Sequence, residues 1–305
     1  MSTNITDNYQ KKYTTKWGNV LQQHTAMLEK YTTFSPKLNG SVVFFDQFGL
    51  IDFEEKTSRI SKTILDEAPT ERRCMRPRMF TKAIGFDEFD GTQMESLDEP
   101  LCKTLDNLRS AAARRMDDVM IQGFLGTNYT GEDGLNSVEL GDTQTIKADH
   151  VESGSAVSSN LTVAKLRATL QKFQENEAWN DDARDAGDQL VIAVTSSQIM
   201  SLLREKEVTS YDFNNLKALV HGDIETFMGF RFVRTQRLPK DKNGNRVNLA
   251  WVKSKAQFGL WDDFKVKISV RDDMDEALQV RARFACGATR LQEEAFVRIL
   301  CDENK

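Results

Sequence analysis

Residues 97–124 limit what this chain can fold into more than any other stretch. Apolar side chains recur there mostly every three or four positions, the spacing that aligns one apolar stripe on an α-helix. Pro100 suits the first turn of such a helix, and Ser96 or Asp98 can cap it. A helix of about 25 residues would be roughly 37 Å long, so we predict a strut along an extended subunit. The stripe comprises Leu101, Leu105, Leu108, Ala112, Met116, Val119, Met120 and Phe124, and the predicted polar face comprises Lys103, Asp106, Arg109, Arg114, Arg115, Asp117 and Asp118.

Composition narrows the class of protein. The chain has 305 residues, enough to bury a core in more than one sub-domain, and a net charge of -5. Its 41 basic residues do not outnumber its 46 acidic ones, so it lacks a global basic excess for gripping nucleic acid. No apolar run approaches the roughly 20 residues that span a bilayer, and the polar N-terminus lacks the apolar core of a signal peptide. We therefore expect a soluble intracellular protein. Its widely spaced cysteines favour reduced thiols over disulfides or a zinc site: Cys74, Cys102, Cys286 and Cys301.

The segments after the predicted strut alternate between helix and strand patterns. A glycine-rich loop at residues 126–134 leads to a predicted helix at residues 161–177. The continuous apolar run at residues 190–194 is typical of a central strand that is covered on both faces. Residues 241–245 contain Asn-Gly, which favours a tight hairpin turn, before a predicted strand at residues 247–252. These patterns predict an α+β fold.

Two segments carry a resemblance to a known family. Residues 228–233 read Met-Gly-Phe-Arg-Phe-Val, and residues 287–291 read Gly-Ala-Thr-Arg-Leu. With the order of elements before them, they resemble the major capsid proteins of tailed bacteriophages, whose fold is shared with encapsulins and herpesvirus capsid floors. The resemblance implies an N-terminal arm, an extended β-hairpin loop, a peripheral domain with a long spine helix, and an axial α/β domain. The implied boundaries are 1–40 for the arm, 41–95 for the loop, 96–160 and 271–305 for the peripheral domain, and 161–270 for the axial domain.

The loop region has the pattern of a hairpin with opposite charges on its two sides. Strand-like segments occur at residues 42–45, 48–53 and 75–84, and Pro77 confines the last of them to an edge or a bulge. An isolated hairpin is barely stable in water, and in the family the matching loop reaches over a neighbouring subunit. We expect either bidentate arginine–carboxylate pairs between subunits or a solvated charged surface. The candidate contacts are Arg72, Arg73, Arg76 and Arg78 on one side and Asp52, Glu54 and Glu55 on the other.

The resemblance also implies a function, partners and a location. The protein would self-assemble into hexamers and pentamers that form an icosahedral shell around the phage genome. Assembly would take place in the host bacterial cytoplasm, and the finished shell would be the capsid of the virion. Its near-neutral charge fits a wall that encloses double-stranded DNA without specific binding. A scaffolding protein, a portal and a cement or decoration protein are the further partners. The polar N-terminal arm is expected to order only against a neighbour, and its candidate scaffold contacts are Lys11, Lys12 and Lys16.

Catalytic and metal-binding patterns are weak in this sequence. The loop at residues 126–133 has the glycine spacing of a phosphate-binding loop. However, Glu132 and Asp133 stand where that motif needs Lys and then Ser or Thr, and two carboxylates would repel a phosphate. The histidines lack the spacing of metal ligands. We therefore expect no enzyme, no cofactor and no metal site.

Two alternatives from other classes stay open. One is an encapsulin-like shell with the same fold around a cargo enzyme. The other is a soluble α/β hydrolytic enzyme with a site around Ser196, Ser197 and His221. No Gly-x-Ser-x-Gly surrounds these serines, and a helix cap is the simpler interpretation of them.

Overall fold

The computed structural model describes residues 19–53, 55, 59, 65, 67–87, 98–152, 157–204 and 226–303. The chain divides into two compact units. Unit 1 comprises Met1–Thr25, Phe80–Arg114 and Phe264–Phe284, and unit 2 comprises Ala26–Met79, Arg115–Asp263 and Ala285–Lys305. Four elements contribute residues to both units: helix α2 (Asp98–Leu125) and strands β4 (Arg78–Phe86), β12 (Ala256–Arg271) and β13 (Ala277–Arg290).

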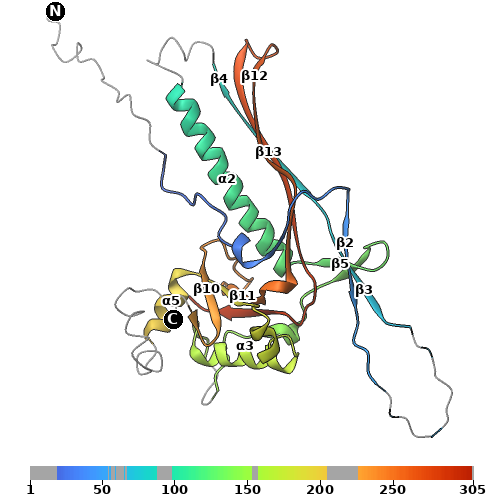
Figure 1. The fold of residues 1–305 in the computed structure, drawn as a ribbon. Helices are drawn as coiled ribbons and strands as arrows, with labels where there is room; N and C mark the ends of the chain where they lie inside the picture. Colours follow the sequence, from blue (N-terminus) through green and yellow to red (C-terminus); the bar gives the residue numbers. More distant parts are fainter. Residues whose placement is uncertain are drawn as a thin grey trace, which may run out of the picture. The chain divides into compact units, whose positions relative to one another are not determined.

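Unit 1 packs the first half of α2 against the β12–β13 ribbon (Figure 1). Leu108 of the helix and Val280 and Ala282 of β13 form its buried centre. This contact confirms the predicted apolar stripe of the long helix, because stripe residues provide the helical side of the core. The partly buried residues packed around this centre are Ile84, Phe86, Leu101, Leu105 and Phe264.

The described end of the N-terminal arm lies along α2 of the same chain. Arg114 Nη1 donates to Gln22 Oε1 at 2.5 Å, and His24 Nδ1 lies 3.0 Å from Ser110 Oγ. We expected this arm to order only against a neighbouring subunit. Residues 19–25 instead find polar partners on their own helix, which the low hydrophobicity of the arm did not indicate.

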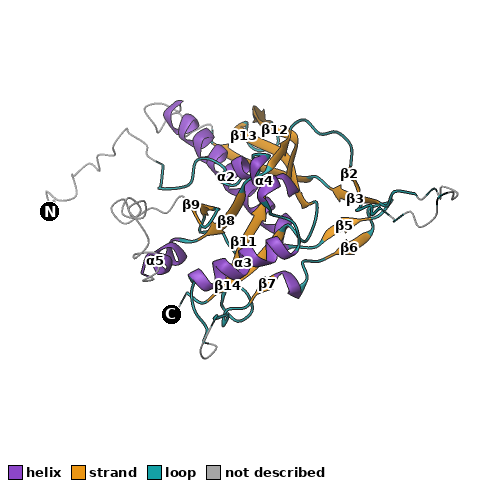
Figure 2. Ribbon diagram, turned by 60° about the horizontal axis from the view of Figure 1, so that its bottom comes forward, coloured by secondary structure: helices purple, strands orange, loops and turns teal. Residues whose placement is uncertain are grey.

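The larger sheet of unit 2 is the predicted α/β layer. Strand β8 lies between β11 and β10, antiparallel to the first and parallel to the second, and all five of its residues are buried. This burial confirms the predicted central strand. Helix α3 (Val163–Glu175) lies against β14 and β7 (Figure 2). The strands in sheet order are β7 (Thr145–Ile146), β14 (Phe296–Cys301), β11 (Arg246–Val252), β8 (Leu190–Val194), β10 (Phe230–Arg234) and β9 (Thr226–Phe227).

The last strand is placed differently from our expectation for residues 271–305. The family resemblance implied that this whole stretch belongs to the peripheral domain, together with the long helix. Strand β14 instead pairs with β11, in a register that joins Val247 to Leu300 and Trp251 to Phe296. Four of its six residues are fully buried, so an interior position in the α/β sheet removes more apolar surface from water than an exposed ribbon would.

The loop region does form a hairpin, but not with the predicted strands: its first strand ends at Phe48, where the strand expected at residues 48–53 would begin, and its second strand lies almost wholly before the strand expected at residues 75–84. Strand β2 (Val43–Phe48) runs antiparallel to β3 (Thr70–Met75), and β3 continues into a four-stranded sheet with β5 (Asn128–Thr130) and β6 (Asn136–Val138). The segment expected at residues 75–84 is split at Pro77, and β4 beyond it belongs to the sheet of order β1–β12–β13–β4. Proline lacks the N–H that a continuous ladder needs.

Short elements complete the described part of the chain. Their bounds are Thr33–Ser35 for β1, Asp181–Asp185 for α4, Ser196–Arg204 for α5, and Glu29–Tyr31, Asp142–Gln144 and Lys253–Lys255 for the 3-10 turns η2, η3 and η4. The Asn-Gly turn predicted before β11 is confirmed by Gly244, whose φ is 82° and whose N–H donates to Asp241 O at 2.9 Å.

Candidate inter-subunit surfaces

The predicted arginines of the hairpin all have partners within the chain. Arg72 lies opposite Asp46 in the β2–β3 pairing, and its Nε is 2.5 Å from Asp46 Oδ1. Its guanidinium also lies over the Phe44 ring, 5.3 Å from the centroid. Arg73 is 5% exposed and makes a bidentate ion pair with Glu293. Arg73 therefore fixes the base of the hairpin. The Arg72 side chain is 40% exposed, so part of it remains accessible to another molecule.

Arg76 contacts β5 and the turn after it, and Arg78 contacts the last turns of α2. Arg76 Nη2 donates to Gly134 O at 3.0 Å, and its guanidinium lies 5.0 Å from the centroid of the Tyr129 ring. Arg78 Nη1 donates to Gln122 Oε1 at 2.6 Å. Both arginines thus hold the hairpin base in place, a role that the sequence did not distinguish from a contact between subunits.

Of the acidic candidates and the arm lysines, the structure describes only two residues. Asp52 and Glu55 are exposed, which leaves their carboxylates available to another molecule. Glu54 lies outside the described residues, as do the three candidate scaffold contacts Lys11, Lys12 and Lys16.

An apolar surface follows β2 directly, and we call residues 48–53 the tip segment. Its large hydrophobic side chains are exposed to water, and Leu50 is 92% exposed. Adjacent exposed apolar side chains of this kind mark a contact surface for another molecule. These side chains belong to Phe48, Leu50, Ile51 and Phe53.

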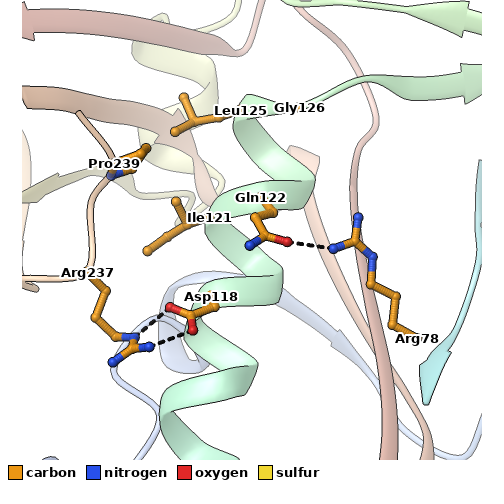
Figure 3. Close-up of a pocket in the computed structure, with 8 residues that line it drawn as sticks. All are labelled: Arg78, Asp118, Ile121, Gln122, Leu125, Gly126, Arg237 and Pro239. Atoms are coloured by element: carbon orange, nitrogen blue, oxygen red, sulfur yellow. Dashed lines mark hydrogen bonds and ion pairs between the residues drawn. The ribbon is translucent and has the colours of Figure 1, made fainter. Parts of the chain in front are cut away.

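A pocket of about 420 Å³ lies beside the last turns of α2 (Figure 3). Asp118 and Arg237 form a bidentate pair at one side, with Nε to Oδ1 at 2.6 Å, and Arg78 and Gln122 lie at the other. The hydrogen bond to Asp118 raises the pKa of Arg237 above its ordinary value. Asp118 and Arg237 therefore neutralise each other, and Arg78 is bound by the neutral amide of Gln122.

Asp117 corrects our interpretation of the polar helix face. We expected Asp117 and Asp118 to be a solvated acidic pair. Asp117 is completely buried, and its carboxylate accepts the backbone N–H groups of Met27 and Leu28 at 3.1 Å. These bonds offset the cost of burying the charge, and they fix residues 26–28 beside the helix.

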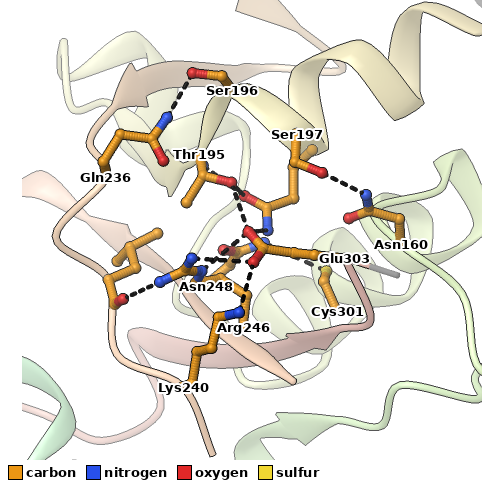
Figure 4. Close-up of polar contacts among 12 residues, drawn as sticks. Asn160, Thr195, Ser196, Ser197, Gln236, Lys240, Arg246, Asn248, Cys301 and Glu303 are labelled. Carbon is orange, nitrogen blue, oxygen red and sulfur yellow. Dashed lines mark hydrogen bonds and ion pairs between the residues drawn. The ribbon is translucent and has the colours of Figure 1, made fainter. Parts of the chain in front are cut away.

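Glu303 is the centre of a polar cluster at the end of the large sheet (Figure 4). Arg246 Nε and Nη2 donate to its two carboxylate oxygens, each at 3.0 Å, and Lys240 Nζ lies 3.3 Å from Oε2. Thr195 Oγ1 lies 3.0 Å from Oε1. The hydrogen bond from Arg246 holds the pKa of Glu303 below its ordinary value. The cluster joins the last residues of the chain to β11 and to the turn before α5.

Glu303→Gln should therefore weaken the fold at neutral pH by about 1–3 kcal/mol, because charge-assisted hydrogen bonds become neutral ones. A carboxyl with a lowered folded-state pKa stabilises the fold above its unfolded pKa, near 4.5, and that contribution disappears as pH falls through the folded-state value. Urea denaturation from pH 7 to pH 3 should show the difference between wild type and variant shrinking below about pH 4.5. The exposed Glu294→Gln is the control, and a difference that does not vary with pH would contradict the assignment.

The serines of the enzyme alternative serve structural roles. Ser197 Oγ accepts from Asn160 Nδ2 at 3.1 Å, and neither Ser196 nor Ser197 hydrogen-bonds to a histidine or a carboxylate in the described part of the chain. Thr195 N–H donates to the Gln198 side chain, the Thr-x-x-Gln arrangement of a capping box. His221 lies outside the described residues.

Sequence reasoning missed the buried Arg290, which has no exposed surface. Its Nη1 donates to Phe124 O and Gly126 O at the end of α2, and its Nε lies 3.7 Å from Glu293. One signal was present: an arginine inside the otherwise small and apolar run Cys-Gly-Ala-Thr-Arg-Leu. A charged residue in such a run is buried only where carbonyls or carboxylates receive it.

Within the described ranges, no cluster of three or more histidine, cysteine or acidic side chains is arranged to hold a metal ion. None of the helices in these ranges combines the length and apolar character needed to cross a bilayer. The four cysteines are free thiols, and all but Cys102 are buried.

Several solved capsids share this fold. The capsid of cyanophage P-SCSP1u is 14% identical with a TM-score of 0.71, over 99% of this chain and 95% of that chain. The cyanophage Pam1 capsid is 9% identical with a TM-score of 0.73, over 99% and 98%. The capsid of a native GTA particle is 12% identical with a TM-score of 0.64, over 97% and 96%. No curated protein matches the chain.

These likenesses show that the chain has the fold of phage capsid subunits. The chain belongs to the phage capsid protein family, which matches residues 5–303. It is a major capsid protein of the tailed-phage type, located in the capsid of the virion, and its shell is built from copies of itself. The resemblance drawn from the sequence is thereby confirmed, and an encapsulin-like shell is not favoured. The family indicates a structural rather than a catalytic role.

Proposed function

We propose that copies of this protein form hexamers and pentamers that close into an icosahedral shell around double-stranded DNA, without catalysing a reaction. The family match over residues 5–303 carries this proposal. A scaffolding protein guides assembly, with Lys11, Lys12 and Lys16 as its contacts; a portal occupies one vertex, and a cement or decoration protein binds outside. Each contact contributes a modest free energy, and closure of the shell multiplies it over many neighbours.

Each part of the subunit has a proposed role in the shell. Residues 1–40 act as the arm and residues 41–95 as the loop that contacts a neighbour. The peripheral domain consists of residues 96–160 with the start of the return segment, and the axial domain consists of residues 161–270. Strand β14 (Phe296–Cys301) belongs with the axial domain, because it pairs with β11 in the same sheet as β8.

We assign the main apolar contact of the loop to the tip segment, residues 48–53. Burial of one large apolar side chain contributes roughly 1.5–3 kcal/mol, whereas an exposed ion pair contributes about 0–1 kcal/mol. Leu50, Ile51 and Phe53 therefore supply affinity. The alignment of the loop on its neighbour is set by charged groups: Asp52, Glu54, Glu55 and the exposed part of the Arg72 side chain. Arg73, Arg76 and Arg78 support the base of the loop from within the chain.

The variant Leu50→Asp/Ile51→Asp tests this proposal. Both side chains are exposed in the subunit, so the fold and its thermal unfolding should be unchanged while negative-stain microscopy shows no closed shells. The matched control Leu50→Met/Ile51→Val keeps the apolar surface and should assemble like the wild type. Normal shells from the aspartate variant would refute the role of the tip segment, and a wild type that never assembles would refute shell formation itself.

A further inference from the structure

The β12–β13 ribbon of unit 1 has a basic face. Phe264, Val280 and Ala282 belong to the core cluster with α2 and therefore share one face of the ribbon. Because successive side chains of a strand point to opposite faces, their neighbours in sequence lie on the other face. Four exposed cations lie on that face, Lys265, Lys267, Arg281 and Arg283, together with the exposed Asp263 at its start and the half-buried Gln279.

Two of these cations have no carboxylate partner within the described residues. Arg281 Nε donates to the neutral Thr81 Oγ1 at 3.3 Å, and Lys267 makes neither a hydrogen bond nor an ion pair there. Same-face neighbours along a strand are about 6.6 Å apart, so the basic face presents closely spaced positive charge. Charge that a subunit leaves uncompensated is available to a partner of opposite sign.

The turn that closes the same ribbon is acidic, and we call residues 272–276 the acidic turn. Its sequence is Asp-Asp-Met-Asp-Glu, and all five side chains are exposed. The turn is held by Met274 N–H to Arg271 O at 3.1 Å and by Ala277 N–H to Met274 O at 2.9 Å. Arg271 neutralises only Asp273, with Nε 2.6 Å from Oδ1. The carboxylates that remain are those of Asp272, Asp275 and Glu276.

We propose that the acidic turn of one subunit docks on the basic face of a second copy, with Lys267 and Arg281 as its receiving charges. This inference rests on the proposed shell assembly and adds a contact that is separate from the tip segment. The two surfaces are complementary in charge, and Met274, which is 60% exposed, adds apolar area at the centre of the turn.

The acidic turn cannot bind the basic face of its own subunit. Lys267 lies five residues before Asp272, about 16 Å along an extended strand, and the turn is fixed at the end of that strand by its hydrogen bonds. Nucleic acid is a poorer occupant than a second copy. The exposed Asp263 lies at the start of the same ribbon segment, the acidic turn lies at its end, and both would repel a continuous polyanion.

Charge reversal tests the docking. Lys267→Glu/Arg281→Glu and, separately, Asp272→Lys/Glu276→Lys should each raise the subunit concentration needed for shell formation by about tenfold or more, because like charges would face each other. Combining all four substitutions in one chain restores the complementarity and should return that concentration close to the wild-type value. Light scattering would follow assembly, and circular dichroism would verify the fold of each subunit.

The control Asp181→Lys/Asp182→Lys changes the net charge as much as the acidic-turn variant does, on exposed acids of α4 in unit 2. It should assemble normally. Shells from both charge-reversed variants at wild-type concentrations would overturn the docking while leaving shell formation intact. Impairment of the basic-face variant alone would also overturn it and would indicate a polyanion on that face. Failure of the wild type to assemble would instead refute the proposed function.

Discussion

Replacing Arg290 with alanine is expected to lower the free energy of unfolding by about 3–5 kcal/mol. The guanidinium is fully buried, and its Nη1 lies 2.5 Å from Phe124 O and 2.7 Å from Gly126 O. The last carbonyls of a helix have no partners within it, so this arginine supplies the partners that end α2. Burial lowers the pKa of Arg290 to about 10, which still leaves it charged at neutral pH.

The measurement is urea denaturation of the unassembled subunit, followed by circular dichroism. Arg298→Ala is the matched control, because that side chain is 27% exposed, donates to one hydroxyl, Thr145 Oγ1, and makes a 3.6 Å ion pair with the fully exposed Asp142. The control should cost about 1 kcal/mol or less. Arg290→Lys, which keeps the charge but loses the planar fork, should fall between the two. Equal losses for Arg290→Ala and Arg298→Ala would contradict the capping role.

Gly123→Ala is expected to destabilise the fold by about 2–3 kcal/mol, although alanine is the better helix former by about 1 kcal/mol. A Cβ at this position would lie 2.6 Å from Ala288 O and 2.9 Å from Ala288 C. Those atoms are backbone of β13 and cannot rotate away as a flexible side chain would. The close approach of α2 to β13 thus requires a residue without a side chain, and steric overlap outweighs the gain in helix propensity.

Gly85→Ala is the matched comparison, because a Cβ there meets nothing within 4 Å. It should leave the thermal midpoint unchanged or raise it slightly, since alanine reduces the entropy of the unfolded chain. If both alanine variants unfold alike, the close contact between Gly123 and Ala288 is not a constraint on the fold.

Local patterns predicted the elements whose side chains report their own surroundings. The stripe on α2, the apolar run of β8 and the Asn-Gly turn before β11 each follow from a spacing or a dipeptide within a few residues. The family resemblance was also readable from sequence, because it rests on ordered segments rather than on distances in space.

The candidate contacts were harder to predict. Clustered arginines in the loop region predicted inter-subunit pairs, yet Arg73 is bound to Glu293, which lies 220 positions away in the chain. Nothing near Arg73 in the sequence identifies that partner. Apolar exposure at Leu50 and Ile51, which supports the tip segment, is likewise a property of packing and not of composition.

The sequence by itself determined the long helix α2, helix α3 and the central strand β8, because periodicity of apolar residues acts over one or two turns of a helix or along one strand. It did not determine the strands of the loop region, where strands were expected at residues 48–53 and 75–84. Only the tertiary structure decided which strands pair and whether each charged side chain is buried with a partner or exposed to water. Strand β14 could have continued the ribbon, and Asp117 could have faced water. Pairing with β11 buries four residues of β14, and the N–H groups of Met27 and Leu28 satisfy Asp117. Both outcomes depend on atoms brought together from distant parts of the chain, which no local pattern encodes.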